Sequence, residues 1–137
     1  MKRVLAPLLL VVALVAIAVA GYWLKRPASA ITVHCLDPVV GCTFDHRETL
    51  ARVRFSVRPT ALETFDLSVR AVGADQVTAE FQMVGMDMGF NRYDLQSAGD
   101  GFFVSRVTLP VCISGRHDWI LYLELDGSRY ALPFTTQ

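Results

Sequence analysis

Apolar and polar residues alternate along most of the chain after residue 50, which is the pattern of strands that bury one face. Between residues 50 and 58 we expect Val53, Phe55 and Val57 to point inward, because arginines and a serine occupy the positions between them. The same period recurs in four later segments. Their expected inward residues are Phe65, Leu67, Val69, Ala71, Val77, Ala79, Phe81, Met83, Phe103, Val107, Leu109, Trp119, Leu121, Leu123 and Leu125.

Shorter strands are expected over residues 31–35, 91–96 and 128–134, and residues 36–42 are expected to form a turn-rich loop. Asp126-Gly127 is a two-residue hairpin signal, and Gly-rich turns separate the other segments. We count seven to eight strands and find no helical pattern after the N-terminus. Residues 31–137 are therefore predicted to form an all-β, immunoglobulin-like antiparallel β-sandwich.

The N-terminus has a different character. Residues 4–24 contain no charged residue, and as a helix they would span about 32 Å, enough for the hydrocarbon core of a membrane. We expect residues 1–26 to form a transmembrane anchor, followed by a linker at 27–30. A cleaved signal peptide is the alternative, since small residues suitable for cleavage occur at 18–20 and 28–30. Both interpretations place the remainder outside the cytoplasm.

Charge is divided unevenly between the two parts. The whole chain has a formal net charge of zero, yet all 13 acidic residues follow residue 30 and four of the 13 basic residues precede it. The exported part therefore carries nine basic and 13 acidic residues, a net charge of −4, and it contains no lysine. This composition argues against a nucleic-acid-binding protein, which needs a basic face.

The chain has three cysteines, Cys35, Cys42 and Cys112, so an oxidising compartment leaves one unpaired. Pairing Cys35 with Cys42 is favoured by proximity. Pairing either one with Cys112 closes a longer loop and is favoured by chain entropy. A metal knuckle formed by the first two cysteines with His34 and His46 is a further alternative, and the sequence leaves the choice open.

Methionines gather in one loop. Apart from Met1, the methionines of the chain are Met83, Met86 and Met88, and glycines at 85 and 89 flank the last two. Thioethers are soft, uncharged ligands that suit Cu(I), and glycines permit a break in the strand that lets the sulfurs converge. His117, His34 or His46 would supply an imidazole. The alternative is that the methionines are flexible packing residues at one end of the sandwich.

The segment FQMVGMDMG (81–89), together with residues 101–103, 109–112 and 115–119, resembles YtkA-like domains. That family is similar to FixH-like and CopC-like sandwiches. The resemblance covers roughly residues 50–134. It implies a membrane-tethered periplasmic protein associated with copper handling or haem-copper oxidase assembly. The chain departs from the family at 109–112, where a further methionine is common and this sequence has Cys112.

We therefore expect a non-enzymatic accessory protein of the inner (cytoplasmic) membrane, with its bulk in the periplasm. Its predicted copper(I) ligands are Met83, Met86, Met88 and His117, and its predicted partner is a membrane complex such as a respiratory oxidase. The alternative is a metal-free interaction module or small accessory subunit of a membrane complex. Catalysis is not expected, because no paired carboxylates, P-loop or zincin signature is present.

Overall fold

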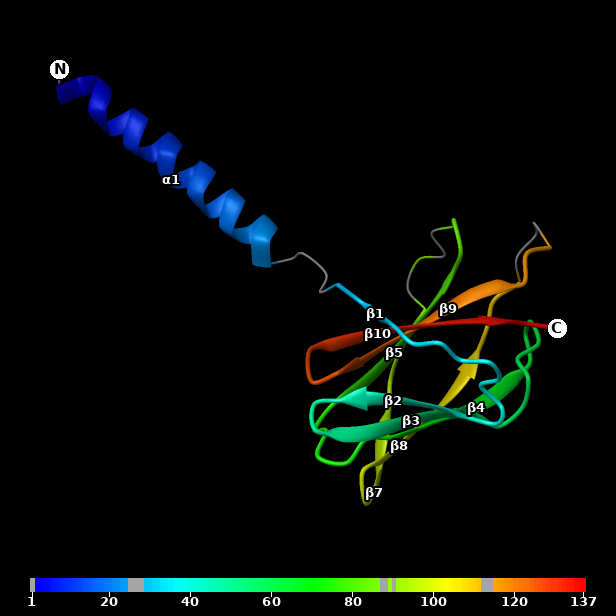
Figure 1. Cartoon of the computed structure of the whole chain (residues 1–137). Coiled ribbons are helices and arrows are strands. Elements are labelled where there is room, and N and C mark those ends of the chain that lie inside the picture. Colours follow the sequence, from blue (N-terminus) through cyan, green and yellow to red (C-terminus); the bar gives the residue numbers. More distant parts are fainter. Residues whose placement is uncertain (1, 25–28, 87–88, 90, 112–114) are drawn as a thin grey trace.

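The computed structural model describes the backbone of residues 2–24, 29–86, 89, 91–111 and 115–137 (Figure 1). The helix α1 (Lys2–Leu24) begins the chain, and its side chains are described from Pro7 onward. The stretch Pro7–Leu24 is long and apolar enough to cross a membrane. The helix therefore agrees with the predicted anchor, and a signal sequence would pass the same test.

The rest of the chain forms a sandwich of two five-stranded sheets (Figure 1). Sheet A has the order β1 (Ile31–Thr32), β10 (Ser128–Thr135), β9 (Asp118–Leu125), β5 (Val77–Met83) and β6 (Arg92–Asp94). Sheet B has the order β2 (Cys42–His46), β3 (Thr49–Phe55), β4 (Thr64–Arg70), β8 (Phe102–Thr108) and β7 (Gln96–Gly99). All neighbouring strands are antiparallel except β1 and β10. The predicted antiparallel β-sandwich is confirmed, with ten strands rather than seven or eight.

The core lies between the sheets and contains the predicted inward residues together with others, among them Phe44, Leu132 and Phe134. Every residue that the alternation predicted to point inward is buried except Val57, which is 54% exposed. The prediction for Val57 was wrong because β3 ends at Phe55, so residue 57 lies in the connection to β4 and no longer follows the strand period. Phe55, Phe81 and Phe134 form a tilted and edge-to-face aromatic cluster at the centre.

Two strands differ from the predicted pattern. Residues 42–46 form the edge strand β2, with Cys42, Phe44 and His46 inward. The predicted loop over residues 36–42 therefore ends one residue earlier, and the strand that follows it was not predicted. Residues 91–96 were expected to form one strand. They instead leave sheet A at β6, pass the buried Leu95 and enter sheet B at β7. Leu95 fills the gap between the two sheets at this crossing.

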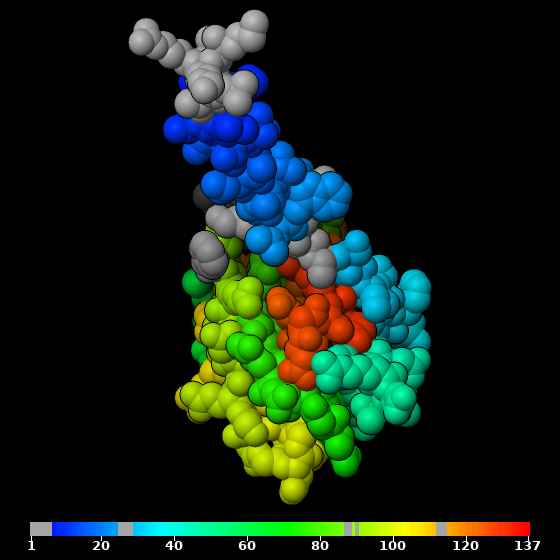
Figure 2. All heavy atoms as spheres, turned by 90° about the vertical axis from the view of Figure 1, so that its left-hand side faces the viewer, coloured from blue at the N-terminus to red at the C-terminus, as the bar shows by residue number. Residues whose placement is uncertain are grey.

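The strand ends define two ends of the sandwich. The entry end holds the hairpin turns after β2 and β9, and it lies close to Ile31, which pairs with Tyr130 near the start of β10. Figure 2 looks onto this side of the molecule, where the teal β2–β3 segment lies beside the red β10 segment. The loop end is opposite. It holds the described connections 34–41, 56–63, 84–86, 109–111 and 115–117, and the C-terminus.

Candidate functional site

The methionine turn, residues 83–86, follows β5 at the loop end. The Met86 N–H donates to the Met83 carbonyl at 3.3 Å, and the two residues form an antiparallel bridge. Gly85, at the third position of this turn, has φ +76°, which a type II turn requires there and which glycine adopts without strain. The strand β5 thus ends at Met83, and the turn, which the glycine permits, brings the Met83 and Met86 backbones side by side.

The two methionines have different surroundings. Met83 is 3% exposed and pairs in register with Trp119 of β9, so its thioether belongs to the core. Met86 is 41% exposed. Met88 and Cys112 lie outside the described residues. The prediction that Met83, Met86 and Met88 form one ligand set therefore remains a prediction.

Arg116 holds the methionine turn in place through a hydrogen bond. Its Nη1 donates to the Val84 carbonyl at 2.7 Å and lies 3.1 Å from the position a Cβ would take on Gly85. The Val84 N–H donates to the Asp118 carbonyl at 3.1 Å. These bonds hold the turn against the start of β9. They also place a guanidinium charge beside the turn, which disfavours a second cation there.

Of the three histidines, His117 is the one that shares a cavity with Met83. Both residues line a hollow of about 210 Å³ together with Trp119 and Leu109, and His117 Nδ1 lies 3.3 Å from Thr136 Oγ1. His34 lies in the β1–β2 connection, and His46 is buried at the entry end. Among the described residues, no three or more His, Cys, Asp or Glu side chains form a metal-binding group.

The disulfide loop, residues 35–42, is the second feature of the loop end. Cys35 and Cys42 form a disulfide with a Cα–Cα distance of 5.5 Å, so the short pairing is the one that occurs. The bond consumes both thiols, and His46 lies at the opposite end of β2, which separates the groups of the metal-knuckle alternative. The disulfide links the chain leaving β1 in sheet A to β2 in sheet B.

Hydrogen bonds fix the disulfide loop at several points. Asp37 accepts from the Val39 N–H through its side chain and from the Gly41 N–H through its carbonyl. Arg52 and Arg54 of β3 donate to the carbonyls of Val40 and Val39, at 3.0 and 3.1 Å. The Phe55 N–H donates to the Pro38 carbonyl at 2.9 Å, and Arg58 pairs with the Asp37 carboxylate at 3.4 Å. The loop is therefore held in one shape.

The fixed loop presents apolar side chains to solvent. Leu36 is fully exposed and Val40 is 69% exposed. Figure 1 shows this cyan loop beside the green β3–β4 connection and the C-terminus. Other exposed apolar residues of the described loop end are Val57, Leu62, Val84, Met86 and Val111. A hollow of about 490 Å³ lies between Leu36 and Val84 and is lined in part by Trp119 and Pro133.

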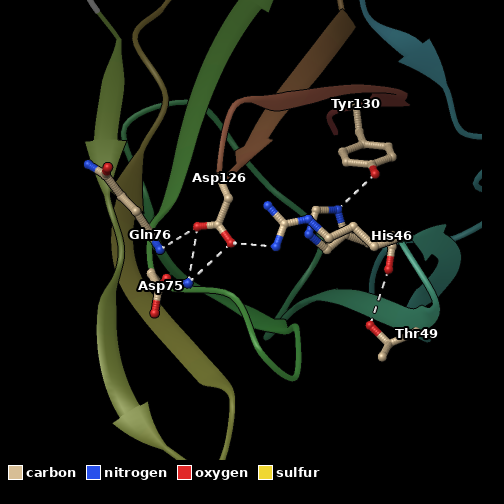
Figure 3. Close-up of polar contacts among 7 residues, drawn as sticks. His46, Thr49, Asp75, Gln76, Asp126 and Tyr130 are labelled. Atoms are coloured by element: carbon tan, nitrogen blue, oxygen red, sulfur yellow. Dashed lines mark hydrogen bonds and ion pairs between the residues drawn. The ribbon is translucent and has the colours of Figure 1, made fainter.

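A polar cluster occupies the entry end (Figure 3). His46 is 2% exposed, and its Nδ1 lies 2.9 Å from the Tyr130 hydroxyl. Its Nε2 is buried without a hydrogen-bond partner among the described residues. Burial lowers the pKa of His46, the positive charge of Arg47 lowers it further, and the Asp126 carboxylate acts in the opposite direction.

Asp126 joins three segments in this cluster. Its carboxylate accepts from the N–H groups of Gln76 at 2.9 Å and Asp75 at 3.0 Å, and it lies 3.6 Å from Arg47 (Figure 3). The Gln76 N–H is the main cause that lowers the pKa of Asp126, while burial opposes the shift. Asp126 and Gly127 both have positive φ, as a type I′ hairpin requires, so the predicted hairpin is confirmed.

Sequence reasoning missed both the apolar loop end and this cluster. The signal for the first was present, because Leu36 and Val40 stand in a turn-rich segment with Asp37, Pro38 and Gly41. The signal for the second is absent from the sequence, since His46 and Tyr130 are 84 residues apart.

Comparison with known proteins identified no relatives: no family model, curated protein or solved structure matches the chain. The resemblance to YtkA-like domains therefore stays a prediction.

Proposed function

We propose that this chain is a membrane-anchored, non-enzymatic accessory protein that docks on the extracytoplasmic surface of a membrane protein complex through its loop end. The observation that supports the proposal is the disulfide loop, a tightly fixed segment that holds Leu36 fully in solvent. Side chains that a fold needs for its own core are buried. A rigid loop that exposes a large aliphatic residue is suited to binding, because little conformational entropy is lost when a partner covers it.

The position of the loop supports a docking role. The chain enters the sandwich from α1 at Ile31, near the entry end, so the loop end lies at the far end of the strands from this attachment. The apolar side chains there have charged neighbours, the paired Asp37 and Arg58 together with Arg116 and Asp118. An apolar centre with a polar rim is the usual anatomy of a protein interface. The expected partner surface is an apolar pocket that receives Leu36.

The test compares two double variants of the full-length protein in its native membranes. Leu36→Glu/Val40→Glu changes the loop end, and Ile31→Glu/Val72→Glu changes two exposed aliphatic residues outside it. After mild detergent extraction, native electrophoresis would measure the fraction of protein in a larger complex. We expect the loop-end variant to migrate alone and the control to remain in the complex. Equal retention of both variants would contradict the proposal.

A second candidate function, Cu(I) binding, is favoured by one observation. Met83 and His117 line the same hollow, and the methionine turn brings Met86 next to Met83. A soft thioether and an imidazole at one cavity form a donor set that suits Cu(I), and the resemblance would connect such a site with oxidase assembly. The guanidinium of Arg116 beside the turn opposes it.

Competition titration of the full-length protein with a Cu(I) chelator separates the two candidates. The comparison uses the Met86→Leu/Met88→Leu and His117→Ala variants, which remove ligands without opening the core at Met83. One-to-one binding that both variants lose would establish copper binding. No binding by the wild-type chain would make the methionines packing residues and leave docking as the function.

A further inference from the structure

The two outer faces of the sandwich carry opposite charge. The outward-facing strand positions of sheet A include four acidic residues and two arginines, a net charge of −2: Glu80, Asp94, Asp118, Glu124, Arg92 and Arg129. The exposed strand positions of sheet B include four arginines and two aspartates, a net charge of +2: Arg52, Arg54, Arg70, Arg106, Asp45 and Asp66. We call this second surface the arginine face. It is positive although the exported part of the chain has a net charge of −4.

The charges of the two faces are used differently. On sheet A, both arginines are paired within the face, Arg129 with Glu80 at 3.1 Å and Arg92 with Glu124 at 3.9 Å. On the arginine face, one pair forms between carboxylate and guanidinium, Arg106 with Asp66 at 3.7 Å, and both side chains are largely exposed. After these pairs sheet A keeps its net charge of −2 and the arginine face its net charge of +2, so the positive potential lies on the arginine face.

The register places two arginines at directly opposed positions on the arginine face. Arg52 of β3 is directly opposite Arg70 of β4, and both side chains are exposed. Like charges at directly opposed positions destabilise a sheet. The next residue in the same row is Phe102 of β8, whose ring lies 5.2 Å from the Arg70 guanidinium carbon. Arg52 donates to the Val40 carbonyl, and no ion pair joins Arg52 or Arg70 to a carboxylate of the described residues, so an anion on this row would neutralise charge that the domain leaves uncompensated.

Apolar side chains accompany the arginines. Leu50, Phe102 and Val104 are exposed on the same face, Val104 in the row next to Phe102. Arginines whose stems lie along exposed aromatic and aliphatic groups match the boundary between lipid headgroups and acyl chains. An acidic protein surface would match the charges but leave these apolar side chains without a counterpart.

The position of the face near a membrane follows from the anchor, so this step depends on the anchoring part of the proposed function. Seven residue steps join Leu24 to Ile31, and they reach at most about 25 Å when fully extended. The domain therefore stays close to the bilayer that holds α1. At that range the orientation of the domain is set by which of its surfaces the lipid attracts.

We propose that the arginine face lies against the anionic headgroups of the bilayer in which α1 is anchored. Arg70 and Phe102 make the central contact, Arg52 lies in the same row while it keeps its hydrogen bond to Val40, and the acidic face of sheet A points away from the lipid. Each basic side chain close to an anionic surface makes that position about fivefold more populated than one away from the surface. A net charge of +2 therefore favours the orientation with the arginine face on the lipid on the order of 20-fold. The loop end then points along the membrane toward a neighbouring complex.

The experiment uses the full-length protein in lipid nanodiscs of two compositions, neutral phosphatidylcholine alone and phosphatidylcholine with 30% phosphatidylglycerol as the stated probe. Phenylglyoxal, an uncharged reagent, modifies accessible arginines, and peptide mass spectrometry measures the rate at each residue. Each arginine is compared with itself between the two discs. Arg70 and Arg106 report on the arginine face, and Arg92 and Arg129 are the controls on sheet A.

We expect modification of Arg70 and Arg106 to be on the order of tenfold slower in the anionic discs, with less than about a twofold change at Arg92 and Arg129. High salt should abolish the difference, because it screens the headgroup charges. An Arg70→Glu/Arg106→Glu variant should lose the protection of Arg54, and Arg92→Glu should keep it.

Equal rates in both discs would overturn the proposal and leave an acidic protein as the partner of this face. Slowing of all arginines alike would also overturn it. Failure of the chain to co-purify with either disc would overturn the anchor itself, and the orientation with it.

Discussion

The imidazole of His46 meets the hydroxyl of Tyr130 at 2.9 Å and thereby joins the first hairpin of sheet B to the last strand of sheet A. The ring is 2% exposed and the phenol is 3% exposed, so this polar contact lies within the core. Because a buried imidazole is more costly to charge than an exposed one, the contact makes the stability of the entry end depend on pH.

Stability should decrease as the pH is lowered below about 6.5, the unperturbed pKa of histidine. The pKa of His46 is lowered in the folded state, so the unfolded chain binds the proton first and stability is lost as the pH falls through that window. The slope cannot exceed about 1.4 kcal/mol per pH unit for one group. Urea denaturation of the full-length protein in detergent between pH 8 and pH 5 measures it. A His46→Gln variant should lose this dependence, and His34→Gln should keep it.

Replacement of Asp126 separates its charge from its hydrogen bonds. Asp126→Ala removes the acceptor of two N–H groups and should cost about 1–3 kcal/mol of unfolding free energy. Asp126→Asn keeps an acceptor and tolerates the positive φ, so it should cost less. Since the pKa of Asp126 is lowered, its stabilisation is present above about pH 3.8 and is lost as the pH falls below that value. Thermal melts of both variants at pH 7 and pH 3 provide the comparison. Equal destabilisation by the two substitutions would argue against the hydrogen-bond role.

Reduction of the disulfide should destabilise the domain moderately. The Cys35–Cys42 bond closes a short loop, for which the chain-entropy model predicts about 2.5 kcal/mol. Melting with and without a reducing agent measures the effect, and a Cys35→Ser/Cys42→Ser variant should melt at the reduced value in both conditions. Cys112→Ser should leave the redox difference intact. A redox difference that disappears in Cys112→Ser would mean that the pairing in solution is another one.

The two methionines of the turn should respond differently to truncation. Met83→Ala opens a cavity beside Trp119 and should cost about 2–5 kcal/mol, whereas Met86→Ala should cost less than about 1 kcal/mol because that side chain is 41% exposed. Denaturant titration of both variants gives the difference. Near-equal costs would show that Met83 is not the packing residue that its burial indicates.

The long strands could be predicted because each alternates over seven or eight residues, and one buried face allows a single phase. Met83 illustrates this, because its phase with Val77, Ala79 and Phe81 predicted the core position that it occupies. β2 escaped prediction because only Cys42, Phe44 and His46 mark its inward face and the strand begins inside the disulfide loop. The division of residues 91–96 between two strands was also not predicted, since no feature of the sequence near Leu95 indicates that the chain passes from one sheet to the other there.

The geometry of the candidate sites follows from the register between strands more than from any local sequence pattern. The sequence located the methionines, but the placement of Arg116 over Val84 and of His117 beside Met83 follows from the pairing of β5 with β9. The same holds for the arginine face. Arg52 and Arg70 are recognisable as outward residues from alternation alone, yet their direct opposition appears only once β3 and β4 are aligned.

The disulfide has a mechanical consequence. A pull on α1 reaches the sandwich through β1, whose two residues pair with β10, and then arrives at Cys35. From there the covalent bond transfers the load to Cys42 and the sheet, so the six residues between the cysteines bear no tension. Leu36 and Val40 thus keep their positions under that load. Reduction would place those six residues in the line of force and lengthen the connection by about 20 Å at full extension.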